Sequence, residues 1–143
     1  MDNVWIYEGK PFEEKDLEQY WGFVYKIKRY NGEYYIGSKS FFNRTNGKIS
    51  KKRSNELYSG RGRKPLREKK IKESDWKSYK TSSKKVQEMI EQNPKEFKFF
   101  IEKLFTTKAE MLLYEAFKII ESFLIRDPFI LNEWVSIKSF KIK

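Results

Sequence analysis

Two short β-rich runs flank the dipeptide Asn31–Gly32, and they constrain the fold more than any other part of the sequence. The first run, FVYKIKRY, covers residues 23–30, and the second, EYYIGS, covers residues 33–38. Asn-Gly between two such runs is the strongest short-range signal for a β-hairpin, because both residues tolerate the positive φ angles of a tight turn. The sequence therefore predicts an antiparallel pair of strands here.

The length of the hairpin loop decides which side chains share a face. With a two-residue loop, Tyr25 and Tyr35 lie on opposite faces of the sheet. With a three-residue loop, in which Gly32 takes the left-handed conformation, Tyr25 lies opposite Gly37 and shares a face with Tyr35. The sequence allows both loops, since glycine serves either. Only the three-residue loop would bring the two tyrosines into one site.

Three further elements follow from local signals. A serine cap and a terminal Asn-Pro predict a helix within residues 82–94. Apolar and polar residues alternate over residues 96–105, which predicts a third strand. Residues 107–124 open with a capping box, Thr107 to Glu110, and carry a broad apolar face, so they predict a long helix. This order of elements predicts an α+β fold with a small three-stranded antiparallel sheet flanked by helices.

The net charge of +11 is spread unevenly along the chain of 143 residues, whose length suits a single domain over residues 1–143. Residues 1–20 carry six acidic and two basic residues. This acidic flank is expected to pack against the domain rather than to fold over its basic face. Residues 26–85 carry 20 basic and five acidic residues, and residues 86–143 carry nine of each. The excess positive charge therefore lies in the middle of the chain.

Most of that charge falls within residues 43–74, whose glycines and Pro65 predict a long basic loop inserted into the domain, with room for a short helix. Such a tract is typical of phosphate binding. The alternatives are a solvated loop that confers solubility and a contact with an anionic membrane surface. Glycines and tyrosines interleave the charges and no amphipathic helix accompanies them, so we favour nucleic acid.

Composition excludes several chemistries. The chain has no cysteine and no histidine, which removes disulfides, the usual zinc sites, thiol nucleophiles and every mechanism based on histidine. No apolar run reaches the roughly 18 residues of a membrane span, and the early acidic residues do not resemble a signal peptide. We therefore expect a protein of a reducing cytoplasm, with no membrane partner and no small-molecule cofactor.

Two segments of the hairpin, Phe23–Val24–Tyr25 after a glycine and Tyr35–Ile36–Gly37, resemble the signature of the GIY-YIG nuclease family. The predicted order of elements agrees with that family, as do Glu115 within the last helix and Asn132 after it. The flanks WIYEGKPF and ESDWKSYKTSS are similar to those of phage-encoded GIY-YIG proteins of the free-standing homing endonuclease type. The resemblance runs over residues 5–134. It implies metal-dependent hydrolysis of DNA phosphodiester bonds in the cytoplasm of a phage-infected bacterium.

The resemblance also assigns roles to the signature residues. Tyr25 would be the general base that activates water, Tyr35 would hold water or phosphate, and Gly37 would be a glycine of close approach on the DNA-binding side. A phenol with a pKa of about 10 ionises at neutral pH only near positive charge. Three lysines of the hairpin are candidates for supplying that charge: Lys26, Lys28 and Lys39.

By the same resemblance, Glu115 is the metal ligand. Helical periodicity alone leaves Glu115 and Glu121 as equal candidates, at opposite edges of the apolar face, whereas Glu110 belongs to the cap. A lone carboxylate with several waters suits Mg²⁺ or Mn²⁺. The metal would polarise the phosphoryl oxygen and stabilise the leaving 3′-oxygen. Asn132 would lie behind these groups or beside the phosphate, the alternative being a turn asparagine.

The catalytic arginine is where this chain departs from the family pattern. The family carries an arginine on a helix about eight residues beyond the signature glycine, often followed by histidine or tyrosine. Here Arg44 comes seven residues after Gly37, and Asn46–Gly47 interrupts any helix. Arg44 is therefore the predicted clamp on the transition state, with Arg53 in reserve. Tyr58 or Tyr79 could replace the absent histidine, and the sequence does not choose between them.

The remaining predictions concern DNA binding. We expect Trp76 to anchor the core rather than to stack on a base. The competing function is a nucleic-acid-binding module that keeps the fold without turnover, whereas an RNA-binding protein is disfavoured because no paired aromatic signature is present. Besides Gly37, the predicted DNA-binding residues are Lys39, Arg53, Arg61, Arg63 and Lys64.

Overall fold

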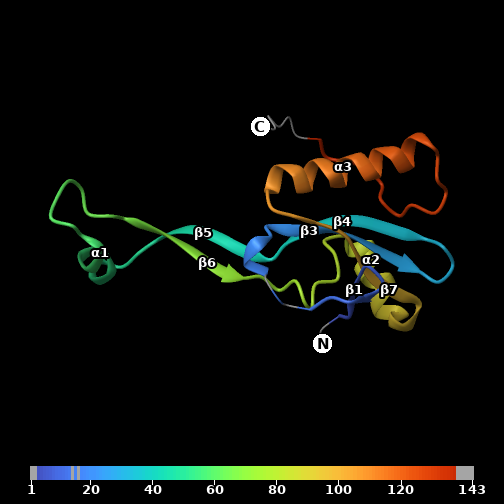
Figure 1. Cartoon of the computed structure of the whole chain (residues 1–143), viewed down its shortest axis with the longest axis horizontal. Coiled ribbons are helices and arrows are strands. Elements are labelled where there is room, and N and C mark those ends of the chain that lie inside the picture. Colours follow the sequence, from blue (N-terminus) through green and yellow to red (C-terminus); the bar gives the residue numbers. More distant parts are fainter. Residues whose placement is uncertain (1–2, 14, 16, 138–143) are drawn as a thin grey trace. The chain divides into compact units, whose positions relative to one another are not determined.

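The computed structural model describes residues 3–13, 15 and 17–137 (Figure 1). The chain divides into two compact units. The first, called here the sheet unit, comprises Met1–Phe41 and Asp75–Lys143, and the second, called the ribbon unit, comprises Phe42–Ser74.

A mixed five-stranded sheet forms the centre of the sheet unit, with strand order β2-β1-β7-β3-β4. All neighbouring strands are antiparallel except β1 and β7, which are parallel. The elements of this unit are β1 (Trp5–Tyr7), β2 (Lys10–Pro11), a 3₁₀ turn (Leu17–Gln19), β3 (Gly22–Arg29), β4 (Tyr34–Ser40), α2 (Lys84–Gln92), a second 3₁₀ turn (Pro94–Glu96), β7 (Phe97–Phe105) and α3 (Lys108–Leu124).

The prediction of a three-stranded antiparallel sheet is wrong, because the N-terminal flank adds two strands. β1 pairs with the edge of β7 that β3 leaves open, with Trp5 opposite Phe99. The Trp5 side chain is 3% exposed, and its indole N–H donates to the Trp76 carbonyl at 2.9 Å. Burial of this large ring together with a satisfied N–H holds β1 in place.

Helices cover both faces of this sheet (Figure 1). α3 packs on one face through an apolar cluster, in which Met111 and Ile119 of the helix meet Val24, Ile36 and Phe105 of the strands. α2 lies on the other side of the sheet in Figure 1 and buries Val86 and Ile90.

The core includes a group of aromatic rings. Trp76 is 3% exposed, and its ring lies 5.2 Å from Phe41 and 6.4 Å from Phe23 between centroids. The prediction of Trp76 as a core anchor is confirmed.

The hairpin of β3 and β4 has the three-residue loop. The Arg29 N–H donates to the Glu33 carbonyl at 2.8 Å, and Gly32 has φ 99°. Tyr25 consequently lies opposite Gly37, and the two signature tyrosines share one face of the sheet.

The ribbon unit is an antiparallel pair of strands with a short helix between them, where a loop over 43–74 was expected. Its elements are β5 (Phe42–Lys48), α1 (Lys51–Leu57) and β6 (Arg67–Glu73). Ser50 caps α1 by accepting from the Arg53 N–H, and the Ser54 hydroxyl donates to the Pro65 carbonyl. The sequence did not predict β5 and β6, because most of their residues are polar and they lack an alternating apolar pattern.

Among the described residues, no helix has the length and apolar character needed to cross a membrane.

Candidate active site

The Tyr25 ring occupies the space beside Gly37. A Cβ atom at position 37 would lie 2.3 Å from the Tyr25 hydroxyl oxygen and 2.4 Å from Cζ. Only glycine leaves room for the ring, which is 1% exposed. Gly37 therefore has a packing role toward Tyr25, and its predicted place on the DNA-binding side stays a prediction.

The Tyr25 hydroxyl is anchored on a residue that no sequence signal marked. It donates to Thr81 Oγ1 at 3.1 Å, inside the protein. Thr81 is 1% exposed and has φ 90°, a conformation that a β-branched residue rarely adopts. The Gln87 side chain donates to the Thr81 carbonyl, and the Ser83 N–H donates to Thr81 Oγ1. Residues held in such conformations cluster at functional sites, so Thr81 joins the candidate site.

Burial raises the pKa of the Tyr25 hydroxyl well above its ordinary value, and the neighbouring Tyr79 raises that pKa further. The expectation that hairpin lysines would lower this pKa is wrong. Lys26 and Lys28 alternate with Tyr25 along β3 and so point to the opposite face. Lys39 shares the Tyr25 face, but its Nζ lies 2.7 Å from Asp75 Oδ1 and 4.3 Å from the centre of the Tyr79 ring.

Tyr35, which shares a sheet face with Tyr25, lines a cavity of about 480 Å³. Its ring centroid is 6.4 Å from that of Tyr25. Ser82 and Ser83, at the start of α2, line the same cavity, as does the Glu115 side chain from α3. Tyr35 and the predicted carboxylate Glu115 thus line one cavity, and Tyr25 lies beside Tyr35 without lining it.

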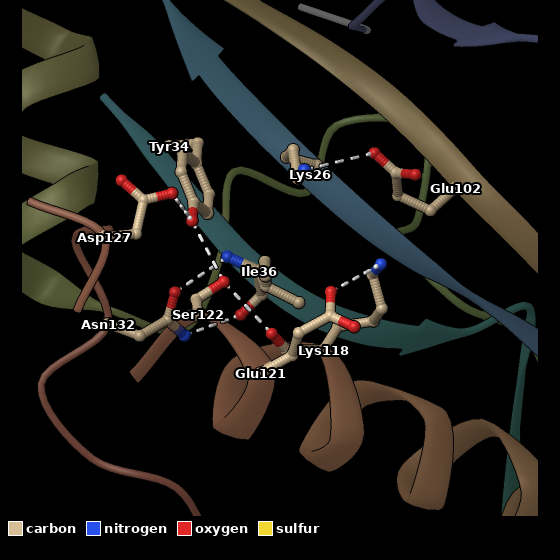
Figure 2. A network of polar contacts seen from close by, with 9 residues as sticks. All are labelled: Lys26, Tyr34, Ile36, Glu102, Lys118, Glu121, Ser122, Asp127 and Asn132. Atoms are coloured by element: carbon tan, nitrogen blue, oxygen red, sulfur yellow. Dashed lines mark hydrogen bonds and ion pairs between the residues drawn. The ribbon is translucent and has the colours of Figure 1, made fainter. Parts of the chain in front are cut away.

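Glu115 reaches this region from the α3 face of the sheet. Its Oε2 accepts a hydrogen bond from the Ser38 hydroxyl at 2.6 Å, and burial raises the pKa of its carboxyl group. Glu121, the other candidate, is 3.3 Å from Lys118 Nζ in an ion pair on α3 (Figure 2). Glu110 lies at the helix cap, where its N–H donates to Thr107. Of the three carboxylates, Glu115 is the one that lines the cavity.

Glu115 fits a metal site of the one-carboxylate type. Within the described residues, no group of three or more His, Cys, Asp or Glu side chains could hold a metal ion. Mg²⁺ keeps several waters and is commonly bound through only one or two carboxylates, so the half-buried Glu115 carboxylate suits it. Glu133, which is exposed, is a second carboxylate that lines the cavity. A cation bound there would also stabilise the ionised form of the Glu115 carboxyl group, which burial disfavours.

Asn132 fastens the C-terminal segment to the signature strand. Its Oδ1 accepts from the Ile36 N–H at 2.9 Å, and its Nδ2 donates to the Ile36 carbonyl at 2.8 Å (Figure 2). Nearby, the Tyr34 hydroxyl donates to Asp127 at 2.5 Å and lies 2.9 Å from Ser122 Oγ. Asn132 also lines the cavity, so its position beside the site comes with a role in holding β4.

The remaining predicted site residues divide between the units. Arg44 lies on β5 of the ribbon unit, with its guanidinium 5.9 Å from the Phe42 ring, so it is on a strand and its catalytic role stays a prediction. Tyr58 also belongs to the ribbon unit. Tyr79, the other candidate for the histidine position, is 5.9 Å from Tyr25 between ring centroids.

Two of the predicted DNA-binding side chains in the ribbon unit already have partners. Arg53 binds Glu68 through Nε at 3.1 Å and Nη2 at 2.7 Å, and its Nη1 is 3.3 Å from Glu56. Lys64 Nζ donates to Asn55 Oδ1 at 2.7 Å. Arg53 is therefore held in an ion-pair network, which makes it a weaker candidate for contact with phosphate.

The sheet thus carries paired tyrosines on one face, a strand glycine beside the first tyrosine and a helix carboxylate that lines the cavity. The family model described as "Putative endonuclease segE, GIY-YIG domain" matches residues 5–133, and the chain belongs to this family. No curated protein and no solved structure matches the chain.

Proposed function

We propose that the sheet unit is a metal-dependent DNA endonuclease that hydrolyses phosphodiester bonds. Membership of a GIY-YIG endonuclease family indicates nuclease activity. The observation that supports metal-dependent hydrolysis of DNA is the arrangement of Tyr25, Tyr35 and Glu115. The first two share a sheet face, and the last two line one cavity.

Glu115 would hold Mg²⁺ or Mn²⁺, and the bound ion would supply electrostatic stabilisation of charge on the phosphoryl and leaving 3′-oxygens. Ser38 orients the carboxylate by donating to Oε2. Because this bond leaves Oε1 available, the Glu115 side chain can bind a cation without losing its support.

Tyr25 would orient the attacking water. Its own proton is directed to Thr81, so a lone pair of the phenol oxygen can accept a hydrogen bond from water. Because its pKa is raised, the phenol is neutral at physiological pH and positions water rather than acting as a standing phenolate. Proton removal by Tyr25 would grow with rising pH.

Phosphate would be received at the start of α2. Ser82, Ser83 and Lys85 all line the cavity at this helix end. The N–H groups of the first helical turn and the positive end of the helix dipole favour an anion there. The charge of Lys85 is partly offset, because its Nζ lies 3.3 Å from Glu133 Oε1.

The test is the nicking of supercoiled plasmid in the presence of Mg²⁺ by the wild-type chain and by Glu115→Gln. We expect wild-type nicking that is abolished by chelation of the metal, and Glu115→Gln should lose it while binding DNA as well as wild type or better. Glu121→Gln is the matched control, because it removes the same charge from the same helix outside the cavity. Normal nicking by Glu115→Gln together with loss in Glu121→Gln would assign the metal to the other edge of α3.

A second candidate function is a nucleic-acid-binding module without turnover. The observation that favours it is the deep burial of the Tyr25 hydroxyl with its raised pKa. The same assay separates the two functions, since this module would bind plasmid and leave it supercoiled at every metal concentration.

A further inference from the structure

The two strands of the ribbon unit sort their side chains onto two different faces. In the β5–β6 register, Asn46 lies opposite Lys69 and Arg44 lies opposite Ile71. Residues that are directly opposite in an antiparallel pair share a face, and so do residues two apart on one strand. One side, called here the basic face, therefore carries Phe42, Arg44, Asn46, Lys48, Arg67, Lys69, Ile71 and Glu73.

The helix of the ribbon unit contacts the other face. Glu68 alternates with Lys69 along β6, and its carboxylate is bound by Arg53 of α1. Glu68, the carboxylate of β6 that pairs with the helix, therefore lies on the face opposite to the basic face. Asn46, Lys69 and Ile71 are exposed, Ile71 to 67%.

A ribbon of this kind matches the major groove of B-DNA in shape. The groove is about 12 Å wide and admits a two-stranded antiparallel ribbon. Phe42–Ser74 has twelve basic and three acidic residues, so its net positive charge is complementary to the negative charge of the DNA phosphates. The basic face also carries side chains that distinguish bases, because asparagine can bind adenine through two hydrogen bonds, lysine can bind guanine, and an apolar side chain can contact the thymine methyl group.

We propose that the basic face enters the major groove of duplex DNA and reads base edges through Asn46, Lys69 and Ile71. Asn46 and Lys69 are direct cross-strand neighbours, and Ile71 is two residues further along β6. The three side chains therefore form one contiguous surface. This inference rests on the proposed function for its DNA substrate, and it assigns the choice of sequence to a unit other than the one that carries the tyrosines.

A-form RNA is a poorer partner for this face. Its major groove is deep and too narrow for side chains to read, whereas its minor groove is shallow and is recognised largely by shape. An amide, an ammonium group and an aliphatic side chain on one face of a ribbon are complementary to the base edges in the major groove of B-DNA. Duplex RNA is accordingly the competitor in the test.

The test uses the full chain with Glu115→Gln, so that substrate is bound without being cut. Selection from a pool of random DNA duplexes should enrich a short motif. Methylation of guanine N7, in the major groove, should interfere with binding to it. Asn46→Ala and Ile71→Ala should each reduce the preference for the motif over a mismatched duplex by about tenfold, the effect expected for loss of one good base contact. Lys70→Ala is the control on the opposite face, and it should weaken binding to both duplexes equally.

The inference is overturned if no motif is enriched, if Asn46→Ala and Ile71→Ala keep the wild-type preference, or if duplex RNA competes as well as DNA. Equal melting temperatures of the variants establish that these exposed changes leave the fold intact. Plasmid nicking by the wild-type chain reports separately on the proposed function. Metal-dependent nicking without sequence preference would refute only base recognition by the basic face. Selective binding without nicking would refute only the proposed nuclease activity.

Discussion

The sheet unit and the ribbon unit are held together in different ways. Among the described residues, every buried apolar side chain belongs to the sheet unit, whereas the buried residue of the ribbon unit is Ser54. The ribbon unit instead depends on the strand ladder, the Ser50 cap and polar contacts such as that of Ser54 with Pro65. An isolated two-stranded ribbon is marginally stable in water.

This difference predicts how each unit responds to change. A dense core transmits a displacement of a single atom, so small substitutions in the sheet unit should affect both stability and rate. A polar ribbon tolerates the loss of side chains, and its substitutions should act mainly on binding.

The largest effect is expected from Tyr25→Phe. The change keeps the buried ring and removes only the hydroxyl, so the cleavage rate should fall by roughly 10² or more. Loss of the hydrogen bond to Thr81 should lower the free energy of unfolding by only about 1 kcal/mol. Single-turnover cleavage and denaturant unfolding measure the two effects, with Tyr30→Phe, at an exposed tyrosine, as control. A rate near wild type would remove Tyr25 from the chemistry.

Gly37→Ala tests the packing of the signature strand. The added methyl group would lie 2.3 Å from the Tyr25 hydroxyl oxygen, so the ring must shift within a closed core. We expect a loss of about 1–3 kcal/mol of unfolding free energy, the usual cost of overpacking, together with reduced cleavage.

The matched control is Gly47→Ala in the ribbon unit, where an added Cβ meets nothing within 4 Å. Chemical denaturation should find this variant as stable as wild type. Equal destabilisation by the two substitutions would contradict the contrast between the units.

Thr81 offers a smaller and more selective change. Thr81→Gly relieves the positive φ but removes the acceptor of the Tyr25 hydroxyl, so stability should change by less than about 1 kcal/mol while the rate falls about tenfold. Thr81→Ser keeps the acceptor and should restore the rate. A residue that served only the fold would show the opposite order, with glycine harmless to the rate.

The sequence predicted elements whose signals are local. The helices expected within 82–94 and 107–124 are observed as Lys84–Gln92 and Lys108–Leu124, because caps and apolar periodicity are encoded by neighbours in the chain. β1 could not be found in this way. It is three residues long, and its partner Phe99 is 94 positions from Trp5, so only tertiary contacts define it.

The site was predictable in the same measure. The resemblance to the GIY-YIG signature assigned Tyr25 and Tyr35 to the site. The face that they share depends on the three-residue loop, which the sequence allowed without requiring. Periodicity left Glu115 and Glu121 equal, and the structure separates them by the cavity that Glu115 lines. Thr81 carries no local signal, since its φ angle is imposed by contacts with α2 and with Tyr25.

The smallest effect concerns the loop of the ribbon unit between α1 and β6. Arg61 and Arg63 are exposed there, and Lys64 is bound to Asn55 through a neutral amide that leaves its charge uncompensated. Each phosphate that a cation neutralises contributes about −0.9 to the slope of log affinity against log salt. Replacing all three with alanine should therefore flatten this slope by about 2–3 and weaken binding to all sequences alike, with no change in cleavage once DNA is saturating.

The control for this triple variant must lose the same charge elsewhere. Lys95, Lys98 and Lys108 are exposed residues of the sheet unit, and their replacement with alanine also removes three positive charges. If the loop contacts phosphate directly, the slope changes far more in the loop variant than in the control, because counterion release depends on close contact and distant charges are screened beyond about 10 Å at 0.1 M salt. Equal slopes in the two variants would reduce the loop to a contribution of net charge, and the ribbon unit would then have to bind DNA through its strands.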